Sequence, residues 1–132
     1  AASDVYKRQD VLLMYAEACN ELGESREALD KLEMVRARAR RTVHPADMTV
    51  GLPEITETGK EKLREIIWNE RRIELALEGH RFFDLIRADK VVPGYAEKMM
   101  KAHGKTNFSI AKHATFFIPQ KQVDISQGVL KN

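Results

Sequence analysis

The sequence of 132 residues contains only one cysteine, Cys19. A single cysteine excludes an internal disulfide framework and a zinc site made of several cysteines. No apolar run approaches the roughly 18 residues that a membrane-spanning helix needs, and residues 1–9 lack the apolar core of a signal peptide. The formal net charge is only +2, so no overall field draws the protein to nucleic acid or to an anionic membrane.

The composition is that of a globular chain with charged helices. Charged residues make up 32% of the sequence and hydrophobic residues 43%, which argues against disorder. The length allows one domain at most. The four histidines form no HExxH motif and no Cys/His cluster, so we expect no metal site and no cofactor.

Residues 10–41 predict a pair of helices. The first covers residues 10–22, and the second covers residues 26–41 with Ser25 as its N-terminal cap. The loop between them is about three residues long, which makes the pair an antiparallel hairpin. The first helix is expected to bury an apolar stripe of Val11, Tyr15, Cys19 and Leu22, which Leu12 and Ala16 widen.

This helix pair fits the tetratricopeptide repeat, which has a period of roughly 34 residues. Ala16, Gly23, Ala28 and Val35 stand where that repeat takes small or compact residues. No second copy follows downstream. Because a lone repeat cannot bury its own apolar face, either a third helix completes the core or neighbouring repeats do.

Residues 42–59 predict a loop, since they contain two prolines and two glycines among polar residues. Helices are expected over residues 60–103. Thr58 and Glu61 have the spacing of a capping box at the start of the first of these helices. Its apolar positions continue as far as Gly79, which is expected to end it.

Two shorter helices are expected next, over about residues 80–87 and 93–103. The tail, residues 104–132, is expected to be extended, with a short β-like run at 115–118 that Pro119 closes. The predicted fold class is therefore mainly α: a tetratricopeptide-like helix hairpin, further helices and a short β-like C-terminal segment.

Three glutamates, Glu70, Glu74 and Glu78, are spaced by four residues and so share one face of a helix that runs to Gly79. A pair such as Glu70 and Glu74 is compatible with the acid and base of a small glycoside hydrolase. Catalytic carboxylates of that class face a sugar across a cleft. Here arginines stand among glutamates on successive turns, so we favour a partly buried Glu–Arg network that holds this helix to its successor.

Other candidate side chains receive structural interpretations. Arg36, Arg38, Arg40 and Arg41 are interpreted as cations at a helix C-terminus and on a solvated face, rather than as phosphate or RNA contacts. Cys19 is expected to be a buried, inert thiol. Aromatic rings can stack on sugars, but core packing is the default interpretation for Trp68, Phe82, Phe83, Tyr95, Phe108, Phe116 and Phe117.

Three blocks of the sequence resemble the SusD/RagB family. Residues 10–39 are similar to the start of the family's C-terminal region. Residues 67–87 look like its hallmark ERR-x-EL…EG-x-R-aromatic-aromatic-DL-x-R stretch, and residues 117–125 are similar to its near-terminal element. The hallmark positions carried over as structural are Glu70, Arg71, Arg72, Glu74, Glu78, Arg81, Asp84 and Arg87.

The resemblance implies a surface-exposed lipoprotein of the outer membrane that binds nutrients. Members of this family capture oligosaccharides, and in some cases peptides, and deliver them to a TonB-dependent SusC-like transporter. They are binding proteins and not enzymes, and no nucleic acid is expected as a partner. Their scaffold is helical and contains tetratricopeptide-like pairs.

Family members are several times longer than this chain. Residues 10–132 therefore look like a C-terminal fragment of a SusD-like domain, and residues 1–9 are expected to be a non-native leader. The lipid-anchor segment and most ligand-binding residues are expected in the missing N-terminal part, so no ligand residue is carried over. Two alternatives stay open: a stand-alone tetratricopeptide-like interaction scaffold, and a small glycoside hydrolase.

Overall fold

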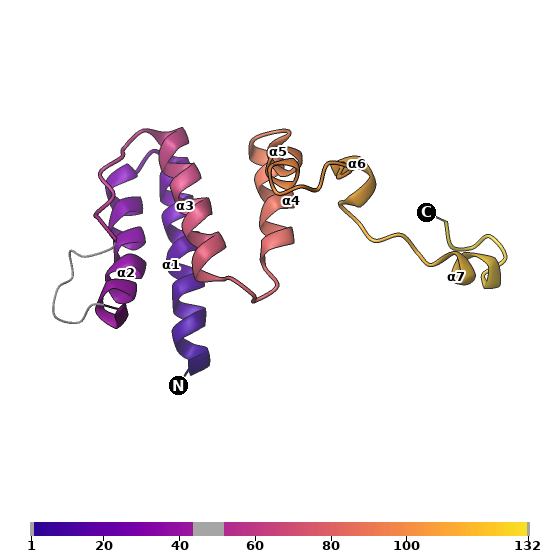
Figure 1. The fold of residues 1–132 in the computed structure, drawn as a ribbon, viewed down its shortest axis with the longest axis horizontal. Helices are drawn as coiled ribbons and strands as arrows, with labels where there is room; N and C mark the ends of the chain where they lie inside the picture. The colour runs from indigo at the N-terminus through magenta and orange to yellow at the C-terminus, as the bar shows by residue number, and fades with distance from the viewer. Residues whose placement is uncertain (1, 44–51, 132) are drawn as a thin grey trace. The chain divides into compact units, whose positions relative to one another are not determined.

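A computed structural model of the protein describes the backbone of residues 2–43 and 52–131. Its helices along the chain are α1 (Ala2–Leu22), α2 (Ser25–Val43), α3 (Lys60–Glu74), α4 (Arg81–Val91), α5 (Tyr95–Ala102), α6 (Ile110–His113) and α7 (Gln120–Ile125) (Figure 1). The described residues contain no β-strand. The mainly α fold class is confirmed. Among the described helices, none is both long and apolar enough to cross a bilayer.

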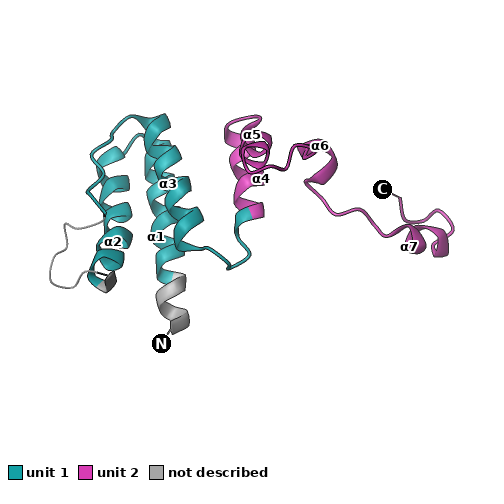
Figure 2. Ribbon diagram, viewed as in Figure 1, with its two compact units in different colours: residues 1–81 teal, residues 82–132 magenta. Residues whose placement is uncertain are grey.

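The chain forms two compact units, Ala1–Arg81 and Phe82–Asn132 (Figure 2). The first unit contains α1, α2 and α3, and the second contains the shorter helices. Helix α1 begins at Ala2. Part of residues 1–9, the segment interpreted as a non-native leader, is therefore helical.

The core of the first unit lies where its three helices meet. Leu13, Ala16 and Cys19 of α1 pack with Leu32 and Val35 of α2, and Leu63 and Ile67 of α3 close the cluster. A third helix therefore completes the core of the hairpin, as one of the two sequence alternatives required. Gly23 has a φ of +87° and ends α1 in the left-handed conformation that glycine adopts without strain.

The face of α1 that packs in the core differs from the predicted stripe. Cys19 and Ala16 are buried, but Val11, Tyr15 and Leu22 are 57%, 47% and 76% exposed. The buried face instead contains Leu13 and three polar residues, Gln9, Glu17 and Asn20. The spacing of apolar residues did not predict this face, because that method places every polar side chain in solvent.

The starts of α2 and α3 differ from the predicted caps. Ser25 is the first residue of α2 and not the residue before it, and its hydroxyl donates to the Thr58 carbonyl at 3.0 Å. Gly59 takes the N-cap position of α3, and its backbone N–H donates to the Glu57 carboxylate at 2.7 Å. The Thr58–Glu61 capping box therefore does not form. Ser25 instead links the start of α2 to the chain that enters α3.

The third helix was predicted to run to Gly79, but α3 ends at Glu74, five residues earlier. Leu77 has a φ of +67° and a fully exposed side chain, which a continuing helix could not accommodate. Glu78 lies in this turn, so it does not share a helical face with Glu70 and Glu74.

The second unit contains more helix than expected. α4 and α5 correspond to the two predicted short helices, but α6 and α7 interrupt the tail that was predicted to be extended. The β-like run at 115–118 has no partner strand among the described residues, and a strand needs one for its backbone hydrogen bonds. Phe82 contacts the rings of Phe83 and Phe108 edge-on, at centroid distances of 6.2 and 6.4 Å.

Candidate functional site

The hallmark stretch begins with a buried ion pair between α2 and α3. An Nη of Arg36 lies 2.7 Å from a carboxylate oxygen of Glu70, and each side chain is only 9% exposed. The other Nη of Arg36 donates to the Pro53 carbonyl at 2.9 Å. Arg36 therefore joins α2, α3 and the segment that precedes α3.

Two further arginines of α2 act in the same region. Arg38 forms an ion pair with Glu74, whose pKa is raised by burial although the Arg38 charge opposes this rise. Arg40 donates to the Leu52 carbonyl at 2.7 Å and pairs with Glu33. The interpretation of these arginines as a solvated face is wrong for Arg36 and Arg40, which are buried. Carboxylates and backbone carbonyls compensate the charges of these two arginines, and most of the partners lie 12 or more residues away in the sequence.

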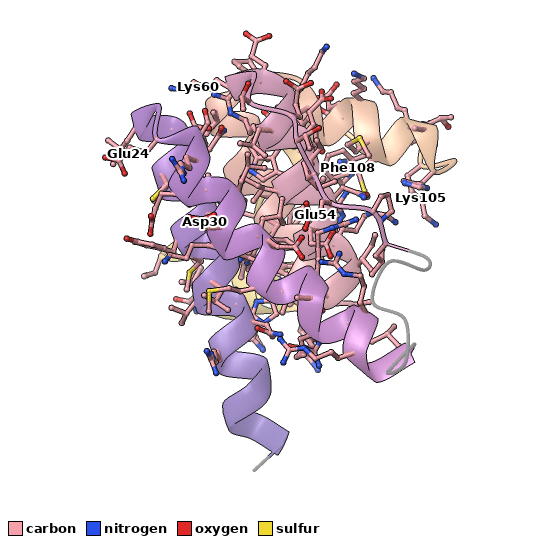
Figure 3. The ribbon with its side chains drawn as sticks, turned by 90° about the vertical axis from the view of Figure 1, so that its left-hand side faces the viewer. Glu24, Asp30, Glu54, Lys60, Lys105 and Phe108 are labelled. Carbon is pink, nitrogen blue, oxygen red and sulfur yellow. The ribbon has the colours of Figure 1, made fainter. Side chains whose placement is uncertain are left out.

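Polar contacts also join α1 to α3. Arg71 lies 2.7 Å from the Asp10 carboxylate, and the indole N–H of Trp68 donates to Glu17 at 2.9 Å. Near the start of α3, Arg64 binds both carboxylate oxygens of Glu21, and Lys60 donates to the Glu21 carbonyl at 2.6 Å. Figure 3 shows Lys60 at the same end of the unit as Glu24, in the α1–α2 turn. The bond from Trp68 accounts for the burial of Glu17, and the amide nitrogen of Asn20 is satisfied in the same way, since it donates to the Lys60 carbonyl at 2.9 Å.

The remaining hallmark residues lie on the exposed side of α3, in the turn after it and in α4. Arg72 is exposed, and it donates to Asn69 on its own helix at 3.0 and 3.2 Å. Glu78 is exposed in the turn after α3. Arg81, the last residue of the first unit, begins α4. In the second unit, Arg87 lies 3.3 Å from Asp84 one turn earlier. The structure therefore brings Glu70, Arg71 and Glu74 together with partners on α1 and α2.

The geometry around Glu70 and Glu74 argues against acid–base chemistry. Both carboxylates project from one helix, and each forms an ion pair with an arginine of α2. A glycosidase needs two carboxyl groups that face a substrate in a cleft. The arrangement is that of a buried network that fixes α3 against the hairpin. Within the described residues, no three His, Cys, Asp or Glu side chains form a cluster that could hold a metal ion.

The candidate aromatic residues have diverse positions. Trp68 is buried, as the core interpretation requires, whereas Phe83, Phe116 and Phe117 are 71%, 94% and 64% exposed. The core interpretation is wrong for these three rings. Cys19 is buried, and burial raises the pKa of its thiol. A raised pKa keeps this thiol protonated and unreactive, as expected.

Comparison with known proteins decides the family. Residues 8–132 match the sequence profile of the SusD family. The chain belongs to the SusD family.

Two curated SusD-like relatives from Formosa agariphila show the extent of the similarity. SusD-like protein P38 is 36% identical over 89 residues, which cover 67% of this chain and 17% of that protein. SusD-like protein P2 is 40% identical over 82 residues, which cover 59% of this chain and 15% of that protein. The matched part thus spans about a sixth of the length of these relatives. No solved structure matches the chain significantly.

Adjacent arginines of the SusD hallmark are expected to differ in importance. Replacing Arg71 with alanine should lower the free energy of unfolding by about 2 kcal/mol, since the change removes a buried charge paired with Asp10. Arg72→Ala should cost less than about 0.5 kcal/mol, because Arg72 is exposed and its guanidinium donates to Asn69 one turn earlier on the same helix. Urea unfolding followed by circular dichroism measures both. Equal losses would contradict the separate roles.

Glu21 is expected to make stability depend on acid pH. The hydrogen bonds from Arg64 lower the pKa of Glu21 below its ordinary value of 4.5. The ionised carboxylate is thus favoured in the folded state, and its contribution is present above pH 4.5 and lost as the pH falls through the lowered pKa. The wild type should therefore lose about 0.5–1 kcal/mol more than Glu21→Gln between pH 6 and pH 3.

Denaturant midpoints of the wild type and Glu21→Gln at several pH values test this difference. The exposed Glu65→Gln change on α3 is the matched control, because it removes a carboxylate from the same helix and leaves the Glu21–Arg64 pair in place. Glu74 has the opposite effect on the pH dependence of stability. Its pKa is raised in the folded state, so its contribution to the free energy of unfolding is most favourable at low pH. If the denaturant midpoints of Glu21→Gln and the wild type changed with pH in the same way, the Glu21–Arg64 pair would add nothing to stability.

Proposed function

We propose that this chain is the C-terminal part of a nutrient-binding lipoprotein on the outer membrane of a cell. In this proposal, the whole protein captures a glycan, or a peptide, at the cell surface and delivers it to a TonB-dependent SusC-like transporter. The single observation that supports it is the match to the SusD family along residues 8–132. The curated relatives are several times longer than the matched part, so the ligand site is proposed to lie outside it.

The proposed role of residues 8–81 is to support the rest of the protein. The ion pairs of Arg36 and Arg71 fix three helices into one rigid unit. Capture and delivery require no covalent chemistry, and the pairing of Glu70 and Glu74 with arginines agrees with a protein that does not hydrolyse its ligand.

Affinity electrophoresis of the whole protein tests binding. The gels contain starch, xylan, mannan or alginate, and we expect migration to slow in at least one of them without any release of reducing ends. Purification from the native outer membrane should also recover a TonB-dependent transporter. The proposal fails if no gel retards the protein and no transporter is recovered. Release of reducing ends that disappears in Glu70→Gln would instead support the hydrolase alternative.

A further inference from the structure

The side of α1 that faces away from the core is apolar. It consists of Val11, Met14, Tyr15, Ala18 and Leu22, which we call the outer face of α1. All five residues are exposed. Their spacing of three or four residues places them along one side of the helix. This side is opposite the buried one, which contains Leu13, Ala16 and Asn20.

α1 differs in this respect from the other two helices of its unit. The exposed positions of α3 are mostly charged or polar, as at Glu61, Glu65 and Arg72, and those of α2 include Arg26 and Asp30. A helix at a protein surface typically turns a polar side to the solvent. The outer face of α1 therefore has the composition of an interior surface.

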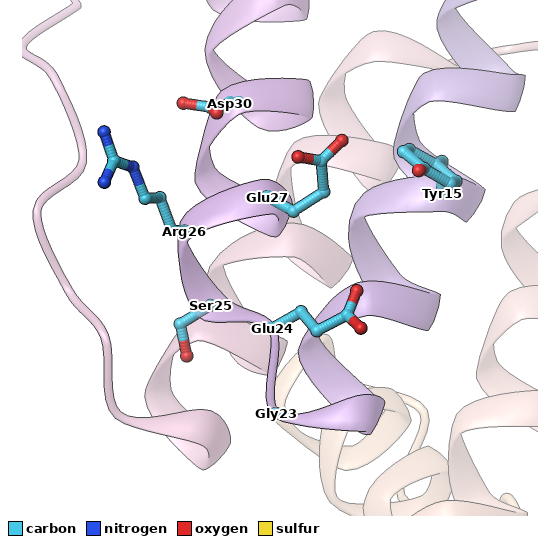
Figure 4. A pocket seen from close by; sticks show the side chains of 7 residues that line it. All are labelled: Tyr15, Gly23, Glu24, Ser25, Arg26, Glu27 and Asp30. Carbon is cyan, nitrogen blue, oxygen red and sulfur yellow. The ribbon is translucent and has the colours of Figure 1, made fainter.

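A shallow hollow continues the outer face toward the α1–α2 turn. Tyr15 lines it together with Gly23 and residues at the start of α2. The carboxylates of Glu24 and Glu27 turn toward the Tyr15 side, whereas Arg26 and Asp30 lie on the other side of α2 (Figure 4). Lys31 pairs with Glu27 at 2.8 Å and lies 5.0 Å from the centre of the Tyr15 ring. With this pair neutralised, Glu24 leaves one negative charge beside the outer face.

We propose that a helix from the part of the polypeptide outside these 132 residues packs along the outer face of α1. The proposal rests on the part of the proposed function that places this chain within a longer protein. The curated relatives provide the necessary length, since the matched residues are only 17% of the first and 15% of the second. Repeat-like helix pairs bury their apolar faces against neighbours of the same chain.

The chemistry of α1 specifies what this helix must offer. Apolar side chains at intervals of three and four residues would fit between Val11, Tyr15 and Leu22. A lysine or arginine near one end would meet the carboxylate of Glu24. A second copy of the chain is the alternative that the crosslinking experiment separates from this helix, because Arg8, exposed one turn before Val11, gives each copy a cation of its own.

Thiol labelling of the whole protein tests the packing. Val11→Cys reports on the outer face, and Glu61→Cys on the exposed side of α3 is the matched control. The buried native Cys19 provides the background rate in the unsubstituted protein. We expect a maleimide to react with Val11→Cys at least 100-fold more slowly than with Glu61→Cys in the whole protein. In the chain of residues 1–132, the two rates should agree within about threefold.

Photocrosslinking identifies what covers the face. With photoreactive benzoylphenylalanine in place of Tyr15, mass spectrometry should find a crosslink within one polypeptide to a residue outside 1–132. Equal labelling of Val11→Cys and Glu61→Cys in the whole protein overturns the proposal. A crosslink to residues 82–131, to a second copy or to an added transporter also overturns it. Nutrient binding is measured separately, so a protein that binds a glycan but leaves Val11→Cys unprotected contradicts only this inference.

Discussion

Arg36→Ala is expected to lower the free energy of unfolding by about 3–5 kcal/mol, because it leaves Glu70 as an unpaired charge in the interior. The Arg36–Glu70 pair is 2.7 Å long, with each side chain 9% exposed, and Arg36 also binds the Pro53 carbonyl. A loss of this size is a large part of the 5–15 kcal/mol that typical domains possess. Urea unfolding measures it, and Arg36→Lys, which keeps the charge, should fall between the wild type and Arg36→Ala.

A double-mutant cycle separates the pair from the rest of the loss. Glu70→Leu combined with Arg36→Met should recover much of the stability that either single change removes, since both buried charges are then gone. Lys31→Ala is the control for an ion pair at the surface, because Lys31 pairs with Glu27 one turn away in a more exposed position. It should cost no more than about 0.5 kcal/mol. A loss below about 1 kcal/mol for Arg36→Ala would mean that the pair does not hold α2 to α3.

Apolar and small residues predicted the architecture better than charged residues did. The hairpin of α1 and α2 follows from Gly23, the short loop and the compact residues Ala16, Ala28 and Val35, all three of which are fully buried. These features act over a few residues, so the sequence displays them directly. The third helix was predicted for the same reason, and Leu63 and Ile67 do complete the core.

The candidate site was less predictable, because its contacts connect distant parts of the chain. The hallmark stretch identified Glu70, Arg71 and Glu74, but their partners Arg36, Arg38 and Asp10 lie 34 to 61 residues away. Nothing in the local pattern distinguishes a buried arginine from an exposed one. The charge of Arg36 suggested solvent, and the neighbouring Arg71 and Arg72 have the same side chain with opposite exposure.

Leu13→Ala is expected to lower the free energy of unfolding by about 3–4 kcal/mol, since it opens a cavity in a close-packed core. Leu13 is fully buried where α1 meets α2 and α3. Val11→Ala is the matched control on the same helix, and it should cost no more than about 0.5 kcal/mol because Val11 is 57% exposed. Urea unfolding of residues 1–132 measures both changes. A larger loss for Val11→Ala than for Leu13→Ala would support the apolar stripe predicted from the sequence and would contradict a buried face that contains Leu13.

The same two substitutions distinguish the chain from the whole protein. If a helix covers the outer face of α1, Val11 becomes a core residue there, and Val11→Ala should cost about 1–2 kcal/mol instead of about 0.5. The cost of Leu13→Ala should hardly change, since its surroundings are already complete within residues 1–81. An increase confined to Val11 would therefore locate the new contact on the outer face. It would also explain why Val11, Tyr15 and Leu22 of the predicted apolar stripe point away from the core of this unit, because in the whole protein these side chains would line a second buried interface.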